Sequence, residues 1–128
     1  MVSVVPHGPG DQLTITIGRR EGWIVVEVSG ELDLSSVDQL KSAVKAALKG
    51  VDEPRLALDL AGVEFCDSSG LTTFVHLRQD VERRAGRFVL LRPHPYVRQV
   101  LEMTGLSPEI GVRDGLSGED PGLTELSA

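Results

Sequence analysis

The sequence contains a single cysteine, Cys66, among its 128 residues, so no disulfide can form within the chain. A fold without disulfides depends on its hydrophobic core, as is usual for proteins of a reducing compartment. Aromatic residues make up only 4% of the chain, so this core must consist mainly of aliphatic side chains. The apolar fraction of 41% is that of an ordinary globular protein, and the length suits one domain.

Positive charge is also scarce, because 13 Lys and Arg residues stand against 19 Asp and Glu residues. The formal net charge of −6 argues against direct binding of nucleic acid, which needs a clustered basic face. No apolar run approaches the roughly 20 residues of a membrane-spanning helix, and the N-terminus lacks the pattern of a signal peptide. We therefore expect a cytoplasmic protein that does not bind a membrane.

Short apolar runs that alternate with helical patterns predict an α/β chain. The expected strands are 13–17, 23–28, 55–60, 88–91 and a short one at 109–113. The expected helices are 37–49, 69–84 and 95–104. The first two strands form a hairpin, and the later alternation implies right-handed crossovers between parallel strands, so the sheet is mixed.

The two ends of the chain and the start of the first helix allow further predictions. Pro and Gly in residues 1–12 indicate a flexible segment, and the composition of residues 114–128 indicates a disordered acidic tail. Ser36 is the expected N-cap of the first helix, and Gln39 is expected to complete a capping box.

Asp67, Ser68 and Ser69 stand between a predicted strand and a predicted helix. Asp and Ser side chains accept hydrogen bonds from the free N–H groups of a helix start, so capping is the simplest role for these residues. The alternative is that one of the two serine hydroxyls is a group that gains negative charge. A helix N-terminus tolerates such a charge because it carries about half a positive elementary charge. Position alone favours capping.

Three motifs occur in order along the chain. They are Gly30-Glu31-Leu32-Asp33, Phe65-Cys66-Asp67-Ser68-Ser69-Gly70-Leu71 and Met103-Thr104-Gly105-Leu106. Their combination resembles the STAS-domain anti-anti-sigma factors, also called anti-sigma factor antagonists, over residues 13–113. The resemblance implies a single STAS domain with a mixed sheet of four to five strands and helices packed mainly on one face.

The resemblance also implies a function. Such proteins bind a serine-kinase anti-sigma factor and free its sigma factor. The kinase inactivates them by phosphorylating the hydroxyl residue that follows the motif Asp, here Ser68, and a serine phosphatase reverses this. Ser69 is expected mainly to cap the helix. The expected partner-binding residues are Glu31, Asp33, Asp67, Ser69, Gly70, Leu71 and Thr72. No cofactor or metal ligand is expected.

Two other functions compete with this one. Asp67, Ser68 and a histidine could form a nucleophilic triad, but the sequence has no Gly-x-Ser-x-Gly elbow, so we expect no enzyme. Alternatively, the chain is a STAS subunit of a stress-signalling or lipid-transport complex, a binding module without sigma-factor regulation. Cys66 is expected to be a small buried hydrophobe rather than a redox sensor.

Overall fold

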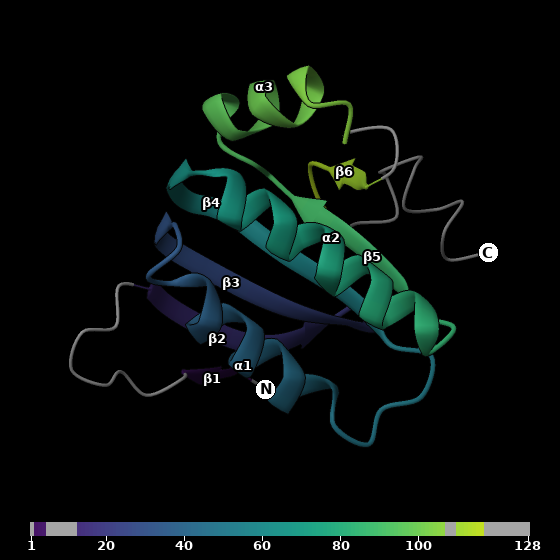
Figure 1. The fold of residues 1–128 in the computed structure, drawn as a ribbon. Coiled ribbons are helices and arrows are strands. Elements are labelled where there is room, and N and C mark those ends of the chain that lie inside the picture. The colour runs from purple at the N-terminus through teal and green to yellow at the C-terminus, as the bar shows by residue number, and fades with distance from the viewer. Residues whose placement is uncertain (1, 5–12, 107–109, 117–128) are drawn as a thin grey trace.

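The computed structural model describes residues 2–4, 13–106 and 110–116, and Figure 1 shows their arrangement. The strands are β1 (Val2–Val4), β2 (Leu13–Arg20), β3 (Trp23–Leu32), β4 (Arg55–Cys66), β5 (Arg87–Leu91) and β6 (Gly111–Arg113). The helices are α1 (Val37–Leu48), α2 (Ser68–Arg83) and α3 (Pro95–Met103). All the predicted elements are therefore present. β1 is an addition within the segment 1–12 predicted to be flexible, and the other residues of that segment lie outside the described ones.

The described strands form one sheet in which spatial order follows sequence order, from β1 to β6. β1 pairs antiparallel with β2, β2 pairs antiparallel with β3, and the remaining pairs are parallel. Glu21 and Gly22 connect β2 and β3 with φ values of 54° and 82°, as a tight hairpin turn requires. The prediction of a mixed α/β sheet is confirmed, with β1 as one strand more than the expected four or five.

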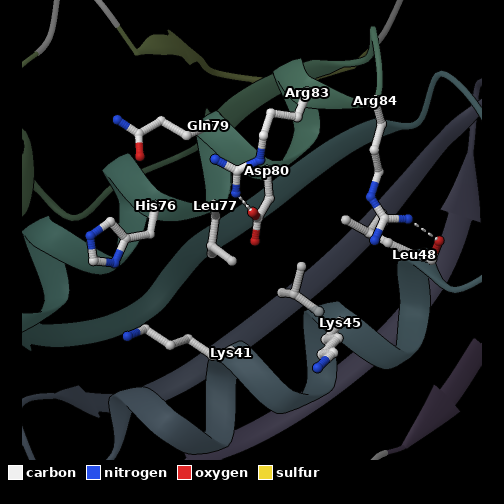
Figure 2. Close-up of a pocket in the computed structure, with 10 residues that line it drawn as sticks. Lys41, Lys45, Leu48, His76, Leu77, Gln79, Asp80, Arg83 and Arg84 are labelled. Carbon is white, nitrogen blue, oxygen red and sulfur yellow. Dashed lines mark hydrogen bonds and ion pairs between the residues drawn. The ribbon is translucent and has the colours of Figure 1, made fainter.

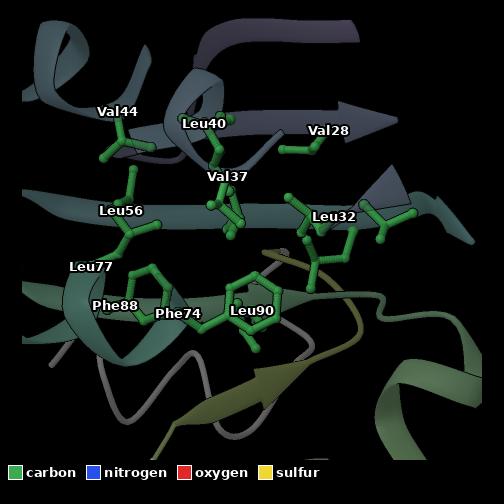
Figure 3. Packing of buried hydrophobic residues seen from close by; sticks show 14 of the residues in the cluster. Val28, Leu32, Val37, Leu40, Val44, Leu56, Phe74, Leu77, Phe88 and Leu90 are labelled. Atoms are coloured by element: carbon green, nitrogen blue, oxygen red, sulfur yellow. The ribbon is translucent and has the colours of Figure 1, made fainter. Parts of the chain in front are cut away.

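The helices pack mainly on one face of the sheet, as predicted, and α1 and α2 cross that face together (Figure 1). Their apolar residues recur at helical spacing, so each helix presents one stripe to the sheet. Figure 3 shows this core, where Leu40 and Val44 of α1 and Phe74 and Leu77 of α2 meet the strands. This core is aliphatic apart from Phe74, Phe88 and Cys66, as the composition indicated.

The opposite face of the sheet carries a second, smaller cluster. It consists of Trp23, Val25, Ala57, Val89, Leu91 and Leu116. Leu116 lies in the segment predicted to be a disordered tail, yet it is buried against this face. The prediction for 117–128 lies outside the described residues.

The topology places two loops beside each other at one edge of the sheet. β3 and β4 are parallel neighbours, and their last residues pair as Glu31 with Phe65 and Leu32 with Cys66. Carboxyl ends of parallel strands meet at the same edge, so the loop into α1 and the start of α2 emerge together. This edge contains the residues for which a function was predicted.

Candidate functional site

Asp67 is the N-cap of α2. Its Oδ1 atom accepts hydrogen bonds from the backbone N–H groups of Ser69 at 2.9 Å and Gly70 at 3.2 Å. The prediction that Ser69 caps this helix is therefore wrong, because Asp67 holds that position and Ser69 lies inside the first turn. The Ser69 carbonyl instead accepts a hydrogen bond from Thr73 Oγ1 at 2.8 Å. Ser and Thr hydroxyls within helices often donate in this way to the carbonyl four residues earlier.

Ser68 is the first residue of α2, and its side chain is exposed. Because Asp67 provides the cap, the Ser68 hydroxyl is not needed for it. The hydroxyl has no hydrogen-bond partner in the part of the chain that the structure describes. Ser68 therefore presents an unengaged alcohol to solvent at the head of α2.

The loop between β3 and α1 lies directly beside Ser68, and hydrogen bonds fix its shape. The Asp67 N–H donates to the Leu32 carbonyl at 3.1 Å, which joins the two loops. The Ser35 hydroxyl and N–H donate to Asp33 Oδ1 at 2.6 Å and 3.0 Å. The hydrogen bond from the Ser35 hydroxyl is the main cause of a lowered pKa of Asp33, so this carboxylate is charged at neutral pH.

Ser36 occupies the N-cap of α1, as predicted, but the predicted capping box is wrong. The Ser36 hydroxyl donates to the Glu31 carbonyl at 2.7 Å and accepts from the Asp33 N–H at 3.0 Å. The Gln39 amide bonds both backbone groups of Leu13, at 2.8 Å and 3.1 Å. Ser36 therefore stabilises the loop locally, whereas Gln39 joins α1 to β2.

A surface pocket of about 240 Å³ brings α1 and α2 together at Ser68. It is lined by Leu34, Val37, Lys41, Ser68, Ser69, Thr72 and Thr73. Leu34 is 77% exposed and adds apolar area to this surface. Leu34, Val37 and Lys41 were missed by the sequence analysis, because no local motif shows which helices pack against each other.

The predicted site residues lie along this edge but differ in exposure. Glu31, Ser68 and Thr72 are exposed, and Asp33, Asp67 and Ser69 are half-buried. Gly70 and Leu71 are buried within the helix–sheet layer. A Cβ atom added to Gly70 would lie 2.5 Å from Cys66 Sγ and 3.2 Å from Leu32 Cβ. Gly70 therefore lets α2 start close against the ends of β3 and β4.

Cys66 lies beneath the site and is 2% exposed. Burial, and secondarily the Asp67 charge, raises the pKa of its thiol to about 12. A thiol with so high a pKa stays protonated at neutral pH and is a poor nucleophile. The prediction of a small buried hydrophobe is confirmed.

A larger pocket of about 510 Å³ lies between α1 and α2 (Figure 2). Within it, Arg83 pairs with Asp80, and Arg84 donates to the Leu48 carbonyl at 2.8 Å. Lys41 lines both pockets. In the part of the chain that the structure describes, no group of three or more His, Cys, Asp or Glu residues could hold a metal ion. None of the described helices is long and apolar enough to cross a membrane.

The chain is similar to several known proteins. The chain is 34% identical over 85 residues to the anti-sigma F factor antagonist of Lysinibacillus sphaericus, covering 66% of this chain and 73% of that protein. A crystal structure of an anti-sigma factor antagonist from Mycobacterium paratuberculosis is similar with a TM-score of 0.75 and 27% identity, covering 94% of this chain and 98% of that one.

A third similarity is to the Bacillus cell fate determinant SpoIIAA in its phosphorylated form. The TM-score is 0.59 and the identity 27%, over 77% of this chain and 89% of that one. Residues 14–118 match the model of the STAS domain. With its mixed sheet, its helices on one face and relatives named as anti-sigma factor antagonists, the chain belongs to the STAS domain family.

Proposed function

We propose that this protein is an anti-sigma factor antagonist that binds a serine-kinase anti-sigma factor, frees its sigma factor, and is switched off by phosphorylation of Ser68. The observation that carries the proposal is the exposed hydroxyl of Ser68, which is free because Asp67 caps α2. The names of the relatives and the phosphorylated form of SpoIIAA support it. A serine phosphatase would restore the active form.

The chemistry requires only that Ser68 be reached. Its oxygen attacks the γ-phosphorus of ATP held by the kinase, the bond to the β-phosphate oxygen breaks, and the hydroxyl proton passes to a base of the kinase. The product carries about −1.5 to −2 charges and three acceptor oxygens. This step does not require the protein itself to act as an enzyme.

The effect of the phosphate falls on the interface with the partner. Covering a neutral hydroxyl with a partner surface costs little binding free energy, whereas burying an unpaired charge typically costs about 3–5 kcal/mol. At about 1.4 kcal/mol for each tenfold change, the affinity falls by roughly a hundredfold to several thousandfold. Phosphorylation can therefore release the partner without a change of fold.

The surface around Ser68 has the mixture of groups that a protein partner requires. Leu34 offers exposed apolar area, while Glu31 and the charged Asp33 offer acceptors at the same edge. Apolar contact supplies affinity, and charged groups at the rim supply specificity and orientation. The buried residues Gly70 and Leu71 support this surface from beneath rather than contact the partner.

The test begins with capture of the partner from the native host and continues with that partner and ATP. We expect mass spectrometry to find phosphate on Ser68 of the parent protein and none on Ser68→Ala. In binding assays, Ser68→Ala should bind like the parent, and Ser68→Glu should bind at least tenfold more weakly. Ser42→Glu adds the same charge at an exposed position of α1 outside both pockets and should bind normally.

Two results would count against the proposal. Equal binding of Ser68→Ala and Ser68→Glu to the kinase would show that position 68 does not control the interface. Capture of a transport ATPase subunit instead of a kinase would favour a STAS binding module without sigma-factor regulation.

A further inference from the structure

A phosphate on Ser68 would receive few hydrogen bonds from the start of α2. The N–H groups of Ser69 and Gly70 already donate to the Asp67 carboxylate, and the Leu71 N–H donates to the Asp67 carbonyl at 3.1 Å. Three of the N–H groups that usually bind an anion at a helix start are therefore occupied. The Asp67 carboxylate also repels a neighbouring dianion, so any cation that neutralises the phosphate must come from another element.

Lys41 of α1 lines the same pocket as Ser68. Of the described residues that line the pocket at Ser68, only Lys41 is basic. The pocket is built from residue pairs four apart on two facing helices, Val37 and Lys41 on α1 and Ser68 and Thr72 on α2. Such pairs lie one above the other on a helix, so Lys41 and Ser68 share one hollow between the two elements.

The lysine is also uncommitted. Its side chain is half-buried, and its ammonium group has no hydrogen bond or ion pair within the described residues. Figure 2 shows it extending along α1 away from Arg84, toward the ends of the helices where α1 and α2 begin. The arginines of the neighbouring pocket differ, because Arg83 pairs with Asp80 and Arg84 with the Leu48 carbonyl.

We propose that Lys41 forms an ion pair with the phosphate of phosphorylated Ser68 and thereby links α1 to α2 across the pocket. The inference rests on the proposed function in that it takes Ser68 as the modified residue. A lysine is well suited to the role, because its flexible stem lets a compact ammonium group follow the phosphate oxygens. The single positive charge of Lys41 offsets only part of the phosphate's charge of about −1.5 to −2, so a net negative charge remains for the partner to cover.

The test uses protein made with phosphoserine incorporated at position 68 during translation, so no kinase is needed. The second pKa of the phosphate, ordinarily about 6, is measured by ³¹P NMR titration. A nearby ammonium favours the dianion and lowers this pKa. Removing it by Lys41→Gln should raise the phosphate pKa by roughly 0.2–0.7 unit, the range expected for an exposed ion pair.

Lys45→Gln is the matched control, because Lys45 lies one turn further along α1 and lines only the larger pocket. It should leave the phosphate pKa within about 0.1 unit of the parent, since solvent and salt screen a more distant charge. In 1 M salt, where the Debye length is about 3 Å, the difference between parent and Lys41→Gln should shrink. Amide NMR spectra of the unphosphorylated variants verify that both are folded.

The same phosphate pKa in the parent and in Lys41→Gln would overturn the ion pair. Equal shifts in the two lysine variants would also overturn it, since they would indicate only a diffuse effect of net charge. Neither result depends on whether a kinase modifies Ser68. The ion pair and the proposed function can therefore fail separately.

Discussion

Asp67 determines how α2 begins, and its carboxylate leaves Ser68 free. The two hydrogen bonds from Ser69 and Gly70 should make it a strong cap. We predict that Asp67→Ala lowers the free energy of unfolding by about 0.5–2 kcal/mol, measured by urea denaturation. Asp67→Asn keeps an acceptor oxygen and should cost clearly less. Equal loss in the two variants would show that the cap oxygen is not what stabilises the helix start.

Gly70 is a second residue at which α2 depends on a close contact. Alanine is favoured over glycine in helices by about 0.8–1.0 kcal/mol, yet here its Cβ would lie 2.5 Å from Cys66 Sγ. Overpacking of this kind typically costs about 1–3 kcal/mol, so we predict that Gly70→Ala is neutral to destabilising by about 2 kcal/mol.

The pairing of Gly70 with Cys66 gives this prediction its control. In a Cys66→Ala background the clashing sulfur is absent, so Gly70→Ala should cost less there than in the parent. Thermal and urea unfolding of the four proteins of the cycle measure the coupling. Equal costs in both backgrounds would contradict the packing explanation. They would mean that contact with Cys66 is not the reason for a glycine at position 70.

At the scale of elements, hydrophobic periodicity predicted the strands and helices, because the buried residues of each element recur with the same period. The alternation in residues 13–17 and the dense apolar run at 55–60 correspond to β2 and β4, and Gly86 follows α2 as expected. Capping was harder to predict, because Asp67, Ser68 and Ser69 are all good caps and only the backbone shows which one is used. Gln39 has the spacing of a capping box but bonds Leu13, a contact across 26 residues.

The pocket at Ser68 also depends on how two elements meet. Sequence motifs located Ser68 and its neighbours on α2, whereas Leu34, Val37 and Lys41 join them only because β3 and β4 are parallel neighbours. Parallel crossovers bring α1 and α2 side by side with their N-terminal ends at one edge of the sheet (Figure 1). A pattern within one helix contains no information about this pairing.

The C-terminal ends of the same two helices are joined by Arg84, which donates to the Leu48 carbonyl at 2.8 Å. The last carbonyls of α1 lack partners within the helix and attract a cation. We predict that Arg84→Ala lowers the free energy of unfolding by about 0.5–1.5 kcal/mol. Arg83→Ala is the control, because Arg83 pairs with Asp80 of its own helix at the surface, and it should cost less than about 0.5 kcal/mol.

Urea denaturation of the two arginine variants distinguishes these expectations. Similar losses in both would mean that the contact between helices adds nothing beyond a surface ion pair. A larger loss in Arg84→Ala would indicate that α1 and α2 are fixed to each other at the end opposite Ser68. The pocket at Ser68 would then lie between two helices of fixed spacing.

In the molecule as a whole, the sheet separates the site from a second core cluster. Asp67 and Ser68 lie at the start of a helix on one face, and Trp23 is fully buried on the other. No pattern predicted that Leu116 belongs to the same cluster as Trp23, because a single leucine among polar residues has no periodicity. Trp23 is the only tryptophan, so its fluorescence reports on the face away from the site.

This arrangement predicts that phosphorylation of Ser68 changes binding without changing the fold. With phosphoserine at position 68, the emission maximum of Trp23 should match that of the parent. The free energy of unfolding should differ by no more than about 1 kcal/mol, since the phosphate and its neighbours are near the surface. The affinity for the kinase should still fall by at least about a hundredfold, because the cost arises when a partner covers the charge. A red-shifted Trp23 emission or a loss of several kcal/mol of stability would instead mean that phosphorylation acts by opening the domain.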